Sequence, residues 1–150
     1  MKKQGLLLHV WPWLYALPHY DQFELASKIY SPSYISFETV LQSSGVIFQD
    51  YSKTITLAAN KSITKQINNI SYEYHKLKDS ILSNPLWIIN KNNLYQIASV
   101  ERALCDMIYL YKNNYFDNIS GLRKELLEEL KYLYPKTTLL LIEQIIHDLW

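Results

Sequence analysis

The chain has 150 residues, of which 49% are hydrophobic, so it is long enough to form one domain with a substantial core. Its formal net charge of +1 excludes a global electrostatic field that would attract nucleic acid or anionic lipid. A single cysteine, Cys105, excludes an internal disulfide and favours a reducing, cytoplasmic location. No apolar run reaches the roughly 18–20 residues that span a bilayer, so we expect no membrane insertion.

The predicted elements begin with an extended strand over residues 5–17, which is rich in bulky apolar side chains and is broken at Pro12. Asp21 is a suitable N-cap for a short helix over residues 22–30. Pro32 then prevents this helix from continuing.

A second short helix is predicted over residues 37–44. Ser36 is the expected N-cap, and Ile35 and Val40 are spaced to form a hydrophobic staple around it. Gly45 supplies the left-handed conformation that ends a helix.

Alternating β-branched and aromatic residues then predict a run of strands. They lie at residues 54–58, 69–78, 87–89 and 94–97. The last two strands flank the asparagine-rich turn 90–93, a pattern that predicts a hairpin.

Three helices follow the strands. They are expected at residues 99–112 with Ser99 as N-cap, at 120–134 with Ser120 as N-cap, and at 137–149 with Thr137 or Thr138 as N-cap. A run of strands followed by a run of helices predicts an α+β fold. We expect a small antiparallel sheet of three or four strands, with helices packed against it and a C-terminal helical segment.

The helix over residues 99–112 has one apolar stripe, so we expect Leu104, Met107 and Ile108 to lie in the core. Its polar side is a candidate contact surface for a partner, formed by Glu101, Arg102, Asp106 and Tyr109. The i,i+4 spacing of Arg102 and Asp106 is equally that of an ordinary surface ion pair, so both interpretations stay open.

Charge is also unevenly distributed along the chain. The segment from Lys53 to Lys91 carries six lysines and two acidic residues, a net charge of +4. Five of these lysines form a candidate basic patch: Lys53, Lys61, Lys65, Lys76 and Lys78. A solvated strand face and a surface for an acidic partner such as DNA are the two interpretations.

The sequence contains no motif of the common catalytic or cofactor-binding classes. Its four histidines lack the spacing of zinc ligands, and it has no glycine-rich phosphate loop and no nucleophile elbow. The acidic Glu101 and Asp106 should raise the pKa of the Cys105 thiol rather than activate it. We therefore expect no metal, no cofactor and no enzymatic activity.

Two segments carry a resemblance to a known family. The segment P-S-Y-I-S at residues 32–36 and the segment I-A-S-V-E-R-A-L-C-D-M-I-Y-L at residues 97–110 resemble the AbiEi family, antitoxins of type IV toxin–antitoxin and phage abortive-infection systems. The family patterns read P-[SN]-S-Y-I-S and I-A-x-P-E-K-A-L-L-D-L-L-Y-L, and the resemblance spans about residues 20–112. The motif positions are Ser33, Tyr34, Ile35, Ser36, Ala98, Glu101, Ala103, Leu104 and Asp106. The departures are Val100, Arg102 and Cys105, which replace proline, lysine and leucine.

The resemblance implies an antitoxin that counteracts a partner toxin of the nucleotidyltransferase fold. Family members usually begin with a DNA-binding winged helix, whereas residues 5–17 correspond at most to its last strand. We therefore interpret residues 1–150 as a single antitoxin domain, with 1–19 at most a remnant of a winged-helix domain, and expect weak or no DNA binding by this chain alone. The alternatives are a transcriptional regulator that binds DNA through the basic strand region and, more remotely, an enzyme.

Overall fold

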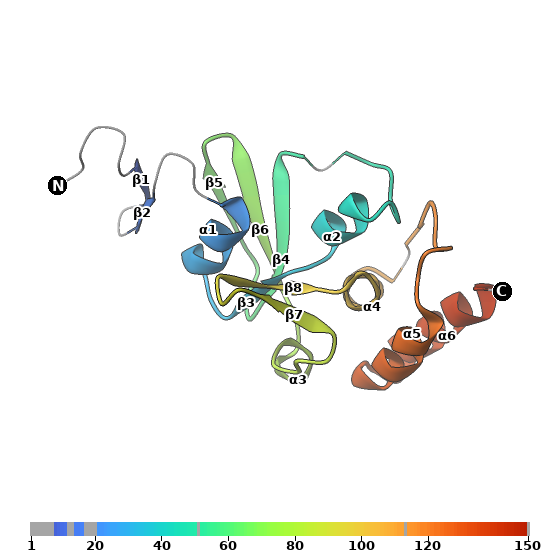
Figure 1. Ribbon diagram of the computed structural model, residues 1–150. Coiled ribbons are helices and arrows are strands. Elements are labelled where there is room, and N and C mark those ends of the chain that lie inside the picture. The colour runs from blue at the N-terminus through green and yellow to red at the C-terminus, as the bar shows by residue number, and fades with distance from the viewer. Residues whose placement is uncertain (1–7, 12–13, 17–20, 51, 113, 150) are drawn as a thin grey trace.

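The computed structural model describes residues 8–11, 14–16, 21–50, 52–112 and 114–149 (Figure 1). Near the N-terminus, β1 (Leu8–Trp11) and β2 (Leu14–Ala16) pair as an antiparallel two-stranded sheet. The strand predicted over residues 5–17 is therefore two strands where it is described, and Pro12 lies outside the described residues.

The main sheet has six strands and mixed topology. Its strands are β3 (Ser33–Ile35), β4 (Thr54–Ala59), β5 (Ile63–Ile67), β6 (Ile70–Lys76), β7 (Ile88–Lys91) and β8 (Tyr95–Ala98). They are arranged in the order β5-β6-β4-β3-β8-β7. The pairs β3–β8 and β4–β6 are parallel, and the other three pairs are antiparallel.

The prediction of an antiparallel sheet with three or four strands is wrong, although the chain is α+β and ends in helices. Two strands were missed. β3 has only three residues, too few for an alternating pattern, yet it joins β4 to β8 at the centre of the sheet. β5 lies outside β6, so β6 returns beside β4 in parallel. The prediction placed Asn69 in a strand, whereas Asn68 and Asn69 have φ values of 51° and 67° and turn the chain between β5 and β6.

Helices cover both faces of this sheet. They are α1 (Gln22–Ile29), α2 (Glu38–Ser43), α3 (Asp79–Leu82), α4 (Val100–Leu110), α5 (Lys124–Leu130) and α6 (Lys136–Asp148), with a 3₁₀ turn at Lys131–Leu133. Figure 1 shows α1 on one side of the sheet, α2 and α4 on the other, and the α5–α6 pair beyond α4. α4 is consequently enclosed from several directions.

Two of the predicted helix caps are confirmed. The Asp21 Oδ1 accepts hydrogen bonds from the N–H groups of Phe23 and Glu24, and the Ser99 Oγ accepts one from the N–H of Arg102. The other predicted caps are wrong: Ser36, Ser120 and Thr137 or Thr138 do not occupy N-cap positions, which belong to Phe37, Arg123 and Pro135.

The core follows the alternation of the strands. The pleat places Ile55, Leu57, Tyr72 and Tyr74 on the face of α1, where the Tyr74 hydroxyl donates to the Ala26 carbonyl. On the opposite face, the buried Thr56 hydroxyl donates to the Ser36 carbonyl and ties β4 to the start of α2. β4 is thus buried on both faces.

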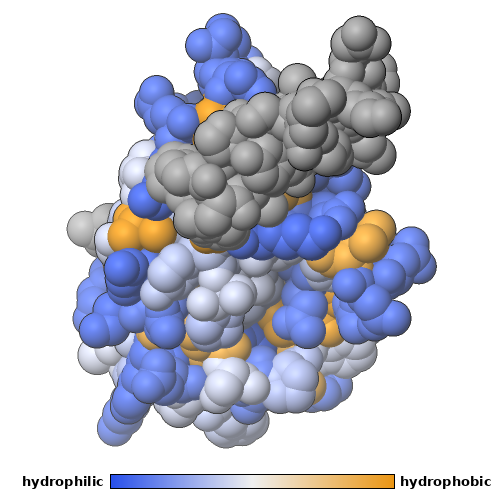
Figure 2. Space-filling model, turned by 90° about the vertical axis from the view of Figure 1, so that its left-hand side faces the viewer, coloured by the Kyte–Doolittle hydropathy of each residue, from blue (hydrophilic) through white to orange (hydrophobic). Residues whose placement is uncertain are grey.

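Figure 2 shows the side of the molecule on which α1 and β5 lie. Where described residues are visible in this view, the surface is mostly hydrophilic, and apolar residues form small, separate patches. This visible part of the surface therefore lacks the broad apolar area that is typical of permanent protein interfaces.

Candidate functional site

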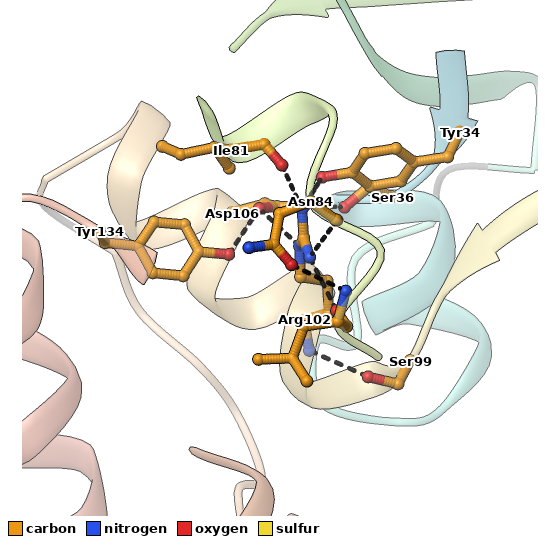
Figure 3. A network of polar contacts seen from close by, with 9 residues as sticks. Tyr34, Ser36, Ile81, Asn84, Ser99, Arg102, Asp106 and Tyr134 are labelled. Carbon is orange, nitrogen blue, oxygen red and sulfur yellow. Dashed lines mark hydrogen bonds and ion pairs between the residues drawn. The ribbon is translucent and has the colours of Figure 1, made fainter. Parts of the chain in front are cut away.

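The residues of the two resembling segments meet in a buried polar network centred on Asp106 of α4 (Figure 3). The Tyr34 hydroxyl and the Ser36 hydroxyl, both from the β3 region, donate to Asp106 Oδ2 at 2.6 and 2.9 Å. The Tyr134 hydroxyl, which follows α5, donates to Oδ1 at 2.7 Å. Three hydroxyl donors thus hold one buried carboxylate.

Arg102 lies one helical turn before Asp106 and connects the network to the α3 region. Its Nη2 group donates to the Ile81 carbonyl at 2.7 Å and to the Tyr34 hydroxyl oxygen at 3.1 Å, while its Nη1 group donates to the carbonyls of Asn84 and Leu86. The Nε atom lies 3.4 Å from Asp106 Oδ1 in an ion pair. The guanidinium therefore pairs the buried charge and fixes the loop after α3.

The electrostatics of the network follow from burial and pairing. Burial raises the pKa of the Asp106 carboxyl, and the Arg102 charge and the hydroxyl donors oppose this effect. Burial and the neighbouring Asp106 charge raise the pKa of the Tyr34 and Tyr134 hydroxyls well above their usual range. The hydroxyls of these two tyrosines therefore stay protonated and act as hydrogen-bond donors, not as bases.

Glu101 makes a second buried connection, between α4 and the start of α5. Its Oε2 accepts a hydrogen bond from the N–H of Arg123 at 2.8 Å, and its Oε1 pairs with the Arg123 guanidinium at 3.1 Å. This carboxylate binds an N–H at the positive end of α5, a favourable place for an acidic group.

The prediction that Glu101, Arg102 and Asp106 form an exposed contact surface is wrong, because they are 1%, 0% and 0% exposed. Tyr109 is half-buried. Their helix is polar on the side that packs against the α3 region, α5 and the chain near Tyr134. Charged residues that pair inside the protein give the same sequence pattern as a solvated helix face, which explains the error.

All nine motif positions belong to or border this interior. Ile35, Ala98, Ala103 and Leu104 are buried apolar residues, and Ser33 pairs with Ala59 at the start of β3. Of the three predicted core residues of α4, Leu104 and Ile108 are confirmed, whereas Met107 is only half-buried.

Cys105 is fully buried beside this network. Burial, followed by the Asp106 charge, raises the pKa of its thiol well above the usual range. The direction is the one predicted from the sequence, although burial contributes more than the neighbouring acids. The thiol is therefore poorly suited to act as a nucleophile.

The five lysines of the basic patch do not form one cluster. Three lie near the end at which β4 and β6 finish: Lys61, Lys76 and Lys78. Lys53 precedes β4 at its opposite end, roughly 20 Å away by the rise per residue of a strand. Lys65 is half-buried in β5 and lies opposite Tyr72 of β6 in the strand register. The predicted basic patch is thus spread over the strands.

Sequence reasoning missed two features of the interior. Tyr134 was expected near the end of a helix, and none of its neighbours in the sequence indicates a hydrogen bond to Asp106. Glu38 begins α2 and is 8% exposed, and its Oε1 accepts no hydrogen bond from any described residue. Phe37, just before it, has a φ of 62°, which is strained for a residue with a side chain.

Comparisons of this chain with protein-family models, with curated proteins and with solved structures find no match. Within the described part of the chain, no helix combines the length and apolar character that crossing a bilayer requires. Among the described residues, no group of three or more His, Cys, Asp or Glu side chains is placed to hold a metal ion.

Proposed function

We propose that this chain is a cytoplasmic, non-enzymatic protein that acts by contacting another macromolecule. Its proposed role is that of an AbiEi-like antitoxin that counteracts a toxin of the nucleotidyltransferase fold. The role comes from the sequence resemblance, and the supporting observation is the network around Asp106.

The network supports this role because it gives the two resembling segments a common structural purpose. Tyr34 and Ser36 come from the first segment and Asp106 from the second, about 70 positions later, and their side chains bond directly. Two unrelated chance resemblances would not be expected to place their polar residues on one buried carboxylate. The contacts favour one structural unit to which both segments contribute.

The same network argues for a structural rather than a chemical use of these residues. Asp106 and Arg102 are fully buried, and their charges are paired with each other and with hydroxyl and carbonyl groups of this chain. A catalytic acid or base must reach its substrate. We therefore assign the motif to the stability of the domain and expect partner contact on a different surface.

The test is growth rescue by co-expression. The chain is expressed together with its proposed toxin partner, sought as a nucleotidyltransferase-like reading frame next to the gene, and colony formation is counted after toxin induction. We expect the wild-type chain to relieve the growth arrest. If the chain is folded and expressed at the level of the toxin and rescue is absent, the antitoxin role is wrong.

A matched pair of variants links rescue to the network. Arg102→Met removes the buried guanidinium, whereas Arg123→Met removes an exposed one that also pairs with a glutamate of α4. We expect Arg102→Met to lower the folded fraction and rescue together, and Arg123→Met to preserve both. Loss of rescue in a fully folded Arg102→Met variant would contradict the purely structural assignment of this residue.

The positions of the lysines support the alternative function, transcriptional regulation through DNA binding, less well than the antitoxin role. Phosphate contacts along a duplex require several cations on one surface, whereas the basic patch is divided between the two ends of β4. We expect weak binding without sequence preference in a mobility-shift titration at physiological salt. Tight, operator-specific binding would favour the regulator instead.

A further inference from the structure

A groove opens on the sheet face that carries α2 and α4, and the residues around it do not include those that bond Asp106. It has a volume of about 700 Å³, and the residues around it include Glu38, Phe48, Met107, Tyr111, Tyr115 and Asp117. We call this the Glu38 groove. It lies between the start of α2, the loop after α2 and the C-terminal end of α4.

Hydrogen bonds between two loops hold the walls of the Glu38 groove in place. The N–H groups of Asp117 and Asn118 donate to the Val46 carbonyl, and the N–H of Phe48 donates to Asp117 Oδ2 at 2.8 Å. The Asn114 side chain donates to the carbonyls of Met107 and Tyr111 at the end of α4. The groove is therefore built from segments that are tied together.

Glu38 is the unusual residue of this groove. It is nine-tenths buried, yet its Oε1 lacks a hydrogen-bond partner in the described part of the chain. A buried carboxylate oxygen without a donor costs free energy, and such groups in native proteins are normally satisfied. Less than 1 Å² of this oxygen is accessible, so a donor that enters the groove would satisfy it once the Glu38 side chain turns toward the opening.

The charge and the side chains around Glu38 specify the kind of donor. Among the described residues that line the groove, Glu38 and Asp117 are acidic and none is lysine or arginine. The C-terminal end of α4, which carries the negative end of the helix dipole, also faces this region. Both features favour a cation over an anion or a neutral group.

Exposed aromatic rings flank this carboxylate. Phe48 is 70% exposed and Tyr115 is 82% exposed, while Tyr111 is 40% exposed. Aromatic faces attract ammonium and guanidinium groups and also cover the methylene stems that carry them. The Asp117 Oδ2 is already bonded to the loop, so the groove offers one carboxylate oxygen without a donor, Glu38 Oε1, and suits one cationic group.

We propose that the Glu38 groove binds a single lysine or arginine side chain from an extended segment of a partner protein, with the cation on Glu38 and the stem against Phe48 and Tyr115. A protein segment fits better than a free polyamine, because one carboxylate matches one cation and the exposed rings offer apolar contact to neighbouring residues. The assignment does not depend on the antitoxin role, since any protein partner with an exposed basic segment can supply the side chain.

The test is an NMR titration of the full-length ¹⁵N-labelled chain with defined probes. The probes are N-acetyl-lysine methylamide, N-acetyl-arginine methylamide, the uncharged N-acetyl-norleucine methylamide and spermidine. We expect the lysine and arginine probes to shift the amide signals of groove residues, and the norleucine probe to bind at least tenfold more weakly. Shifts scattered over the acidic residues of the surface, or equal binding of norleucine, would overturn the proposal.

Two pairs of variants test the assigned contacts. Glu38→Gln should weaken the lysine probe at least tenfold, whereas Glu125→Gln, which alters an exposed carboxylate of α5, should leave its binding unchanged. Tyr115→Ala should weaken it severalfold, whereas Tyr132→Ala, which removes a comparably exposed ring of the 3₁₀ turn, should not.

The amide spectrum of each variant reports whether it is folded. Because Tyr115 is exposed, Tyr115→Ala should fold, so the test does not depend on Glu38→Gln alone. Undiminished binding by folded Glu38→Gln or by Tyr115→Ala would refute the site. A groove that binds spermidine but neither amino-acid probe would be a polyamine site, and the proposal would be wrong.

Discussion

Replacing Arg102 by methionine is the most direct perturbation of the network around Asp106. Methionine preserves most of the length of the side chain but removes the guanidinium, so Asp106 keeps its charge and loses its only ionic partner in the described structure. The Ile81 carbonyl, which the guanidinium binds at 2.7 Å, also loses this donor but keeps the backbone N–H of Asn84.

The expected cost follows from burial. Removing one partner of a buried ion pair typically costs about 3–5 kcal/mol, because the remaining charge is left uncompensated. The three hydroxyl donors to Asp106 remain and limit the damage. The carbonyls of Asn84 and Leu86 lie in half-buried residues, where water can replace the lost donors. We therefore expect a loss of about 3–5 kcal/mol, a large part of a typical domain's stability of about 5–15 kcal/mol.

The assay is urea denaturation followed by far-UV circular dichroism, with Arg123→Met as the control. The Arg123 side chain is 56% exposed, so water can take its place beside the buried Glu101 carboxylate, and the backbone N–H of residue 123 still donates to Glu101 after the substitution. The control should therefore lose clearly less stability than Arg102→Met. Adding Asp106→Asn to Arg102→Met should cost less than the sum of the two single changes, because the unpaired charge is removed. A loss below about 1 kcal/mol for Arg102→Met would refute the buried pairing.

Three further measurements test other parts of the structure. Leu104→Ala should lower the free energy of unfolding by about 2–5 kcal/mol in chemical denaturation, because Leu104 is completely buried; a loss below about 1 kcal/mol would contradict its packing. Cys105 should react with a thiol reagent such as DTNB only as fast as the fold opens, and readily in urea, because burial raises the pKa of its thiol and blocks access; rapid reaction of the native chain would contradict this. Burial raises the pKa of the Glu38 carboxyl; the Glu38 backbone N–H and His75 oppose this effect, and Glu73 adds to it. The wild-type chain should therefore lose stability relative to Glu38→Gln as the pH rises from about 4.3, the ordinary glutamate pKa, through the raised pKa of the folded chain. Unfolding curves of both proteins at pH 4 and pH 7 measure this difference, and a pH-independent difference would show that the carboxylate has an ordinary pKa in the fold.

Local signals in the sequence were reliable where short-range chemistry decides the structure. Ser99 caps α4 as predicted, and the predicted hairpin between β7 and β8 turns at Asn92 and Asn93, whose φ values of 54° and 61° suit asparagine. Such features depend on a few neighbouring residues, so a single sequence contains the information needed to recognise them.

Long-range features could not be predicted in the same way. β3 owes its place to its pairing with β4 and β8, and its three residues alternate too briefly to be recognised. The i,i+4 pair of Arg102 and Asp106 has the same spacing on a surface or in an interior, and only the surrounding elements decide between them. The prediction of a contact surface was wrong for this reason, since hydrophobic periodicity detects buried apolar residues and does not detect charged residues that are buried as pairs.

The position of Asp106 also has a consequence for how the protein opens. Its carboxylate is shared between β3, through Tyr34 and Ser36, and the C-terminal helices, through Tyr134. If α5 and α6 swung away alone, a buried acceptor would lose a donor and the Glu101 carboxylate would lose its partners at the start of α5. Local opening that separates these helices from the sheet is therefore penalised. In native-state hydrogen exchange, the amides of α4, α5 and the central strands should exchange together as one cooperative unit.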